Sequence, residues 1–326
     1  MNRITLVCLA LITGLVGCST ASTPPQWSMS VPEDYPASGY LTGVGEASNR
    51  EQAEQRALAA LARAFEVNIN EQSRDFSLFR SAEGDEPEGT NQQVSSRQLI
   101  AATQQVIEGA SPVEYWQYEQ QYLVLVALER GGAEQRLRQK INQLDQQSAA
   151  LIRYADNRQR NSVVQISALE RARKLQHQRT PLNRNLSVVS GKSIAPPVTL
   201  AQLEKEIRDR LAELQFQLSA DTQLLPQLQH AVGQIGASVQ DAGDLNLNGS
   251  MDREPIVQQQ GWFWLRGALQ LTLSNNQGEV IAEQRWPVKI SAQEPGMVEQ
   301  RLKDQINADI ANQLYQLLTA TRVDAG

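Results

Sequence analysis

The segment from Glu134 to Gln178 contains neither proline nor glycine, and this continuity constrains the fold more than any other feature of the chain. Apolar side chains recur within it at spacings of three, four or seven residues, which is the periodicity of one helix face. The first set is Leu137, Ile141, Leu144, Leu151 and Ala155, and a second set, Val163, Ile166 and Leu169, continues with a phase shift near Asn161 and Ser162. A single helix would be about 68 Å long, and a bend or a helical hairpin at the shift is the alternative. Residues 179–198 are expected to form a loop or linker.

Both cysteines, Cys8 and Cys18, lie in the first eighteen residues. Their position excludes a disulfide scaffold, a thiolate zinc site and a cysteine nucleophile from the rest of the chain. The two histidines, His177 and His230, are far apart and lack metal-motif partners, so each is expected to be a surface or half-buried polar residue. Since no serine-hydrolase or zinc-protease motif occurs either, we expect no catalytic residue, no cofactor, and a protein that is not an enzyme.

The N-terminus has the form of a secretory signal peptide. Arg3 precedes an apolar run from Ile4 to Val16, which is too short to span a bilayer of about 30 Å. The last four residues of the segment 1–18, Leu15-Val16-Gly17-Cys18, resemble the bacterial lipobox. That resemblance implies lipid transfer to Cys18 and cleavage between Gly17 and Cys18, giving a signal peptide of residues 1–17. The alternative is an ordinary signal peptide with an accidental cysteine.

Ser19, not an aspartate, follows the lipidated residue. By analogy with the sorting rule of enterobacterial lipoproteins, this favours the outer membrane, with the protein facing the periplasm. Residues 18–26 are then a polar tether. The mature chain carries 29 basic and 36 acidic side chains, a net charge of −7, so attraction to nucleic acid is not expected.

A first folded unit is expected over residues 27–130. It begins with a strand at Tyr40–Ala47, followed by a capping box from Ser48 to Glu51 and a helix whose stripe is Ala53, Ala57, Ala60, Leu61 and Ala64. An alternating segment at 67–70 and a loop at 81–90 come next. Three further strands are expected around 97–108, 113–120 and 122–129, the last of them central because it is mostly apolar.

This order of elements resembles the LPP-twenty family of bacterial lipoproteins. Trp27, Gly43, Gly45, Ala47 and the alanine-rich helix carry the resemblance, and the lipobox strengthens it. It covers about a third of the chain. The resemblance implies a small α/β-sandwich-like domain without catalytic residues. Some relatives are surface antigens, and some form rings or disks in the flagellar basal body.

A second unit is expected over residues 199–320, with a short tail at 321–326. Thr199 is positioned to cap a helix, Gln215–Ala220 alternates as a strand does, and a helix runs from Leu224 to Ile235. Strands at 262–274 and 280–290 flank the turn Asn275-Asn276-Gln277-Gly278, which is a strong hairpin signal. A final helix carries the stripe Leu302, Ile306, Ile310, Leu314 and Leu317. The expected fold is α+β: two small α/β-sandwich-like domains with mainly antiparallel sheets, joined by a long basic helix or helical hairpin over residues 131–198.

A weak calcium-loop candidate lies in the second unit. Asp244, Asn246, Asn248 and Asp252 stand at positions one, three, five and nine of such a loop, with Gly249 at the turn. Position twelve, which should supply a bidentate carboxylate, is Pro255. A plain polar strand with a turn is the favoured alternative, so no metal site is expected.

Charge gives the other candidate site. Residues 136–192 carry twelve basic and three acidic side chains, a local net charge of +9. The possible interaction surface comprises Arg153, Arg158, Arg160, Arg171, Arg173 and Lys174. It could contact lipid phosphates, a protein partner or a second copy of the chain, and the alternative is a solvated helix neutralised within the protein. Trp262, Phe263 and Trp264 form an aromatic cluster in which alternation places the two tryptophans on one face.

These features favour binding or assembly over catalysis. We expect an outer-membrane-anchored periplasmic lipoprotein acting as a non-enzymatic scaffold or assembly factor, for which a flagellar basal-body role is one form. Its expected partners are the outer membrane, a periplasmic protein or a second copy, and not nucleic acid. The alternative is a regulator of a cell-wall synthase; an enzyme or a calcium-binding module is a weaker one.

Overall fold

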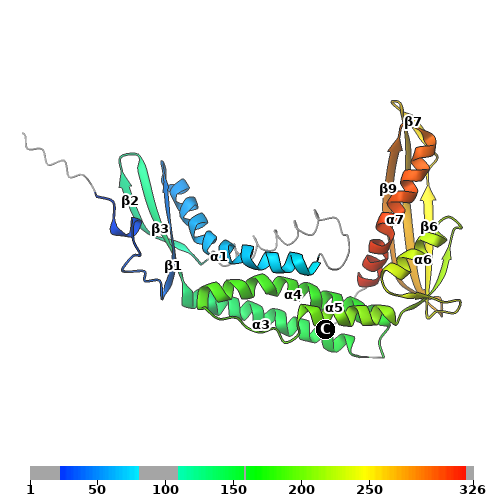
Figure 1. The fold of residues 1–326 in the computed structure, drawn as a ribbon, viewed down its shortest axis with the longest axis horizontal. Helices are drawn as coiled ribbons and strands as arrows, with labels where there is room; N and C mark the ends of the chain where they lie inside the picture. Colours follow the sequence, from blue (N-terminus) through cyan, green and yellow to red (C-terminus); the bar gives the residue numbers. More distant parts are fainter. Residues whose placement is uncertain (1–22, 81–108, 158, 321–326) are drawn as a thin grey trace, which may run out of the picture. The chain divides into compact units, whose positions relative to one another are not determined.

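The computed structural model describes residues 23–80, 109–157 and 159–320, with backbone only for residues 66–80 (Figure 1). The chain divides into two compact units. The first contains the residues up to Gln135 together with Ser187–Gly191, and the second contains Arg136–Leu186 and the residues from Lys192 onward. The two units are described in turn.

The first unit is built on a three-stranded antiparallel sheet. Its strands are β1 (Tyr40–Ala47), β2 (Ser111–Tyr118) and β3 (Gln121–Glu129), in the order β1-β3-β2, and a short 3-10 helix, η1 (Gln26–Ser28), precedes them. Strand β3 is central, as predicted, and Val124–Leu128 are all buried.

Helix α1 (Arg50–Arg80) packs on one face of this sheet through a stripe of buried side chains. Ala53, Ala57 and Leu61 are fully buried, and Phe65 is 1% exposed. The helix approaches β1 so closely that a Cβ at Gly45 would lie 2.1 Å from the Ala53 carbonyl oxygen. The close approach explains why small side chains line both elements at this contact.

Two expectations for the first unit need correction, and two others fall on residues that the structure does not describe. The cap of α1 is Asn49, not Ser48, because the Asn49 Oδ1 accepts a 2.8 Å hydrogen bond from the Gln52 N–H. Residues 67–70 are helical, not an alternating segment, since α1 continues to Arg80. The loop predicted at 81–90 and the strand predicted at 97–108 lie outside the described residues.

The long segment without proline or glycine forms a helical hairpin, which was one of the two alternatives. Helix α3 (Arg130–Ala155) and helix α4 (Ser162–Ser190) run antiparallel, because Asp145 pairs with Arg179 and Ser148 with Gln176. The break lies where the hydrophobic phase shifts, and the Asn161 Oδ1 accepts a 2.8 Å hydrogen bond from the Val163 N–H at the start of α4.

The loop predicted at residues 179–198 is wrong for its first half. Helix α4 continues through Pro181 to Ser190. A proline inside a helix removes one backbone hydrogen bond and costs about 3 kcal/mol. Buried side chains offset that cost here: Leu182 is 4% exposed, Leu186 is fully buried, and Arg179, two residues before the proline, forms a buried ion pair.

The second unit also contains a mixed sheet with helices. After α5 (Leu200–Ala212) come β4 (Gln215–Ala220), α6 (Leu225–Gln234), β5 (Ser238–Val239), β6 (Leu245–Arg253), β7 (Val257–Gln259), β8 (Trp262–Asn275), β9 (Val280–Ala292) and α7 (Pro295–Thr319). Thr199 caps α5 in a capping box with Gln202, and the β8–β9 hairpin forms as predicted, with Gly278 at φ +82°.

The α+β class is confirmed, whereas the sheet of the second unit is mixed. Its strand order is β5-β4-β6-β8-β7, with β9 on the other side of β8, and β4 pairs in parallel with both β5 and β6. Helix α6 provides the crossover that a parallel connection from β4 requires. Periodicity along the chain identified β4 as a strand but carried no information about the direction of its neighbours.

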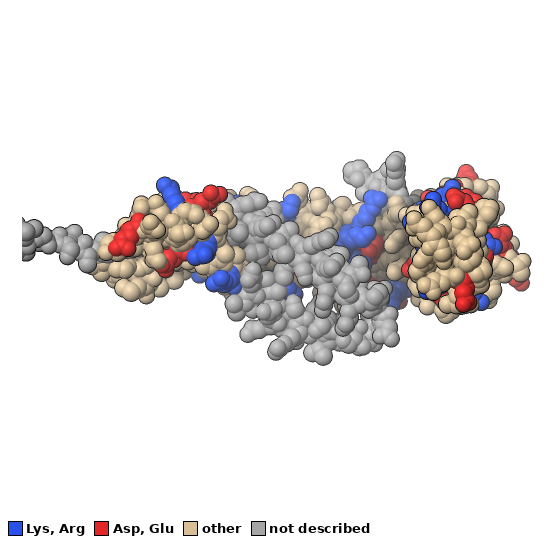
Figure 2. Space-filling view, turned by 90° about the horizontal axis from the view of Figure 1, so that it is seen from above, with Lys and Arg blue, Asp and Glu red and all other residues tan. Residues whose placement is uncertain are grey.

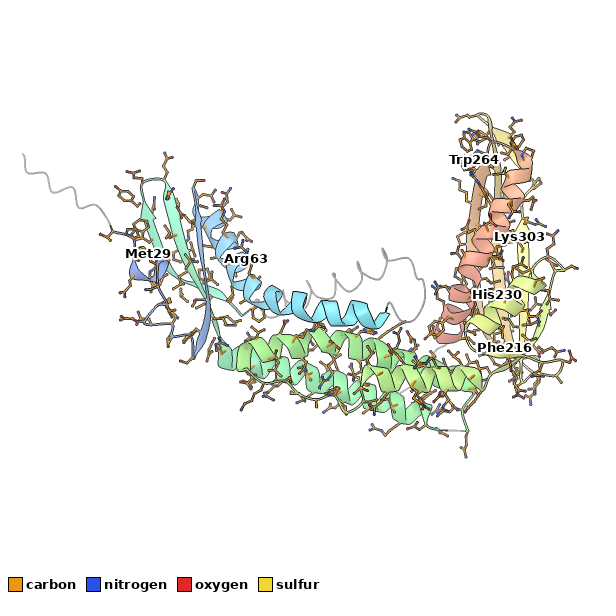
Figure 3. The ribbon with its side chains drawn as sticks, in the orientation of Figure 1. Met29, Arg63, Phe216, His230, Trp264 and Lys303 are labelled. Atoms are coloured by element: carbon orange, nitrogen blue, oxygen red, sulfur yellow. The ribbon has the colours of Figure 1, made fainter. Side chains whose placement is uncertain are left out.

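One hydrophobic core joins the helical hairpin to the C-terminal residues. Val163, Ile166 and Leu169 of α4 cluster with side chains of α5, β4, α6 and α7, among them Leu203, Ile207, Phe216, Leu228 and Leu314. Phe216 is labelled in Figure 3. The helices that we expected to be a connector therefore belong to the same compact unit as the C-terminal sheet. Across the parts of the chain that the structure describes, no helix is long and apolar enough to cross a bilayer.

Candidate functional site

Glu170 of α4, which is 2% exposed, is the most heavily buried charged residue described in the second unit, and it lies at the centre of a cluster of polar side chains. Arg173 donates to both carboxylate oxygens, from Nε at 2.7 Å and from Nη2 at 2.8 Å. The Tyr315 hydroxyl of α7 donates to Oε2 at 2.9 Å, and Glu204 of α5 lies 3.9 Å from the Arg173 guanidinium. The cluster thus connects three helices, and its carboxylate is fully occupied by hydrogen bonds within the protein.

The electrostatics of this cluster keep both Tyr315 and Arg173 protonated. Burial, and then the charge of Glu170, raises the pKa of the Tyr315 hydroxyl well above its ordinary value. The hydrogen bonds that Arg173 donates to Glu170, and then the charge of that carboxylate, raise the pKa of Arg173. Tyr315 therefore stays a neutral donor and Arg173 a cation, an arrangement suited to holding helices together and not to moving a proton.

This raised pKa predicts alkaline sensitivity of the second unit. Because the unfolded state releases the Tyr315 proton near pH 10 and the folded state retains it, the stability that this group contributes is present below pH 10 and is lost as the pH rises above it. Each pH unit above 10 should remove up to about 1.4 kcal/mol from this group. Tyr315→Phe should lower stability at pH 8 and flatten its decline between pH 10 and 11, as measured by urea unfolding. An equally steep decline in the variant would contradict the assignment.

Several of the six predicted basic residues are engaged by other groups of the protein. Arg173 is committed to Glu170, and Lys174 lies 3.9 Å from the same carboxylate. The Arg160 guanidinium lies 3.7 Å from the centre of the Tyr154 ring, in a cation–π contact. Arg153 is exposed, Arg171 is half-buried, and Arg158 lies outside the described residues. In Figure 2, basic and acidic side chains are interspersed over the atoms shown in colour.

The calcium-loop candidate is an extended strand. Residues 245–253 form β6, in which Leu245 and Leu247 point into the core, so the chain does not fold back around a cation. Asn246 Nδ2 donates to the Asn275 carbonyl, and Asp252 pairs with Arg285 at 2.6 Å. Among the residues that the structure describes, no group of three or more potential metal ligands occurs. His230 is exposed on α6 (Figure 3), and His177 lies half-buried beside Arg173.

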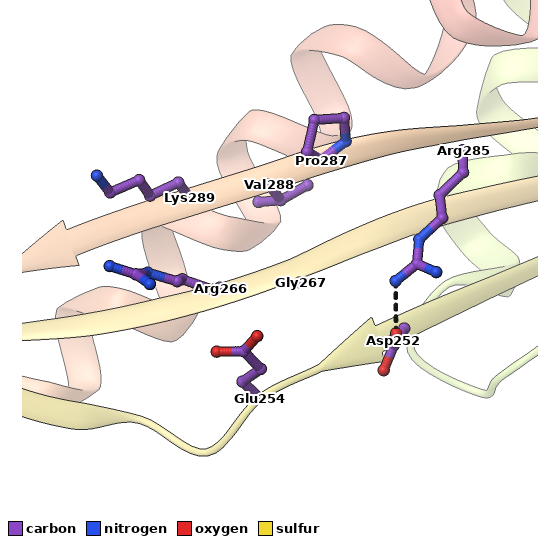
Figure 4. A pocket seen from close by; sticks show the side chains of 8 residues that line it. All are labelled: Asp252, Glu254, Arg266, Gly267, Arg285, Pro287, Val288 and Lys289. Atoms are coloured by element: carbon purple, nitrogen blue, oxygen red, sulfur yellow. Dashed lines mark hydrogen bonds and ion pairs between the residues drawn. The ribbon is translucent and has the colours of Figure 1, made fainter.

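A depression of about 260 Å³ that sequence reasoning missed lies on the outer face of β6, β8 and β9 (Figure 4). Arg266 and Lys289 are directly opposite each other across β8 and β9, Glu254 lies across from them, and the Arg285–Asp252 pair is at the other end. Like charges directly opposite in a sheet repel each other. Lys289 lies 4.9 Å from the centre of the Trp264 ring, which provides it with one favourable partner. The depression is open and mixed in charge, which suits weak polar contacts.

The aromatic cluster of the second unit follows the predicted alternation. Phe263 packs against a second, smaller core that contains Leu265, Val298 and Leu302. Trp262 is 39% exposed, and Trp264 lies on the same outer face beneath Lys289. One side of the cluster is therefore core, and the other faces outward. The lipobox residues Gly17 and Cys18 lie outside the described part of the chain.

The N-terminal part of the chain matches a known protein family. A family model described as LPP20 lipoprotein matches residues 25–129, close to the range 27–130 predicted from the sequence. The N-terminal part of this chain is an LPP20 lipoprotein domain. The LPP20 domain thus comprises the β1-β3-β2 sheet, α1 and the segment between α1 and β2. No curated protein matches the sequence.

Several solved structures are similar to the chain, among them the following three. The secreted protein HP1454 from the human pathogen Helicobacter pylori has 14% identity and a TM-score of 0.43, covering 86% of this chain and 98% of its own. A minor lipoprotein from Acinetobacter baumannii has 17% identity and a TM-score of 0.27, covering 32% and 90%. A putative lipoprotein from Caulobacter crescentus has 17% identity and a TM-score of 0.27, covering 36% and 95%. At these values the likenesses carry no functional argument.

Proposed function

We propose that this chain is an outer-membrane-anchored lipoprotein that faces the periplasm and acts as a non-enzymatic scaffold or assembly factor. One observation carries the proposal: an LPP20 lipoprotein domain begins at residue 25, seven residues after a lipobox cysteine. A lipid attached to Cys18 would hold that domain close to the bilayer. Several acyl chains anchor a protein far more firmly than a single marginal chain does.

The interior of the second unit supports a binding role. Glu170 and Arg179 are buried charges and Arg173 is a half-buried one, and each has its partners within the protein. Such networks fix the positions of the helices that they connect. Each unit has a core of its own, so each can present a surface to a partner, whether a periplasmic protein or a second copy. Regulation of a cell-wall synthase is the second candidate function, and a flagellar basal-body role is one form of the first.

Anchoring is tested by two substitutions at the cleavage site. Cys18→Ser removes the thiol that would carry the lipid. The variant should accumulate as the uncleaved precursor, or should leave the membrane pellet for the soluble fraction. Ser19→Asp should leave lipidation intact and shift the protein from outer-membrane to inner-membrane fractions on a sucrose gradient. Cleavage and membrane sedimentation that persist in Cys18→Ser would contradict the anchoring proposal.

The scaffold role is tested by photo-crosslinking in intact cells. A photoreactive residue in place of Arg153 or Trp262, both exposed, should give discrete adducts with an envelope protein or with a second copy. The same residue in place of buried Leu169 is the control that should give no intermolecular adduct. Recovery of a cell-wall synthase would favour the regulatory function over the scaffold.

A further inference from the structure

The LPP20 domain has an aromatic, apolar face on the side of its sheet opposite α1. In an antiparallel pair, residues that are directly opposite point to the same face. Leu123 of β3 is opposite Trp116 of β2 and Glu46 of β1, so these three side chains share one face. Their neighbours Gly45 and Tyr115 point the other way: Gly45 packs against α1, and the Tyr115 hydroxyl bonds to Glu54 of that helix.

This face is accessible to a large partner. Trp116 and Tyr118 stack with ring centres 5.9 Å apart, and Tyr118 is 43% exposed. Met29, which follows η1 and is labelled in Figure 3, is 77% exposed. Together with Pro24 and Leu123, these side chains line a depression of about 420 Å³. We call Met29, Trp116, Tyr118 and Leu123 the aromatic face.

The short chain between Cys18 and the aromatic face indicates that a bilayer is the partner of this face. Pro24, which lines the depression, is six residues after Cys18. Six residues span at most about 20 Å when fully extended. If Cys18 carries lipid, as the proposed function requires, the aromatic face is held permanently within that distance of a bilayer. Tethering over so short a span gives a high effective concentration for even a weak contact.

The chemistry of the face matches the bilayer interface. Tryptophan and tyrosine concentrate at the headgroup level of membranes, where an apolar ring and a polar edge are both satisfied. The charged side chain that lines the depression is Glu46, and no lysine or arginine lines it. Attraction to anionic lipid is therefore not the driving force. We propose that the aromatic face rests on the interfacial region of a zwitterionic leaflet, inserting Met29, Trp116 and Tyr118 among the headgroups.

Hydroxyl-radical footprinting tests this proposal at side-chain resolution, because methionine, tryptophan and tyrosine all react readily. The chain from residue 18 to 326 contains one cysteine, so Cys18 can be coupled either to a maleimide lipid in phosphatidylethanolamine–phosphatidylcholine vesicles or to a water-soluble maleimide. Oxidation of Met29, Trp116 and Tyr118 should fall at least threefold on the vesicles. Tyr115 is the internal control, since it is 44% exposed on the same strand but on the opposite face, and its oxidation should stay unchanged.

Variants and salt complete the test. Trp116→Ser combined with Tyr118→Ser should abolish the protection of Met29, whereas Tyr115→Ser should retain it. Protection should persist in 0.5 M salt and should not increase with anionic lipid. Equal oxidation in the two coupled forms, or equal protection of Tyr115, would overturn the proposal, as would protection that appears only when an envelope protein is added. Chemical coupling replaces biological lipidation, so such a failure leaves the fractionation test of Cys18 unaffected.

Discussion

Replacing Asp145 with alanine should destabilise the second unit by about 3–5 kcal/mol, the cost typical of leaving a buried charge without its partner. Asp145 of α3 pairs with Arg179 of α4 at 2.7 Å, and the Arg179 side chain is 3% exposed. Arg179 also donates to the carbonyls of Ile194 and Ala195, which hold it in place and prevent it from reaching water. The melting temperature should fall by about 10 °C, measured by calorimetry, because a unit of this size shifts roughly 2–4 °C per kcal/mol.

Two controls separate burial from pairing. Lys205 and Asp209 of α5 form an ion pair at 2.6 Å, but their side chains are 72% and 52% exposed. Asp209→Ala should therefore leave the melting temperature unchanged, since exposed pairs contribute little. The double variant Asp145→Leu with Arg179→Met should recover most of the lost stability, because it removes both buried charges. If Asp145→Ala and Asp209→Ala had the same effect, burial would not be the cause.

Gly45→Ala should destabilise the first unit by about 3 kcal/mol, at the upper end of the cost of overpacking. The new Cβ would lie 2.1 Å from the Ala53 carbonyl oxygen and 2.3 Å from the Ala57 nitrogen. Both atoms belong to the backbone of α1, so no side-chain rotation can relieve the overlap, and the helix would have to move away from β1. Urea unfolding followed by circular dichroism measures the loss.

The matched control is Gly131→Ala in the same unit. There the added Cβ would meet only the Glu129 side chain at an ordinary 3.6 Å, at the start of α3. Alanine is a better helix former than glycine by about 1 kcal/mol, so this variant should be neutral or stabilising. A Gly45→Ala protein as stable as Gly131→Ala would show that α1 is not in close contact with β1.

The sequence predicted elements well where one side-chain pattern dominates. The spacing of Leu203, Ile207 and Leu211 after a capping threonine predicted α5, and the Asn275–Gly278 turn predicted the β8–β9 hairpin. It failed at Pro181, where a local helix breaker is overridden by buried neighbours along α4. It also failed at residues 67–70, where alternation over four residues was too short a signal against a helix already under way.

The sequence could likewise predict a candidate site only where the site is a linear motif. The lipobox is read as a linear motif, so Cys18 could be proposed from sequence. The sequence could not predict that Arg266 and Lys289 lie directly opposite each other. That pairing depends on a register shift between Leu273 and Ser274 of β8. Without that shift, Arg266 would pair with Val288, a core residue on the other face. The aromatic face likewise exists only because β2 aligns Trp116 with Leu123.

The sequence by itself determined the elements that depend on near neighbours: the helices with regular apolar stripes and the strands with alternating ones. The signal peptide and the lipidation of Cys18 stay predictions from a linear motif. Tertiary structure alone decided that α3 and α4 close into a hairpin and that β4 runs parallel to its neighbours. It also decided that Glu170 meets Tyr315, a residue 145 positions away. The physical reason is the separation along the chain between the residues that interact. Helix stripes and turns are set by side chains a few residues apart, whereas the partners of a buried charge are set by which surfaces exclude water together.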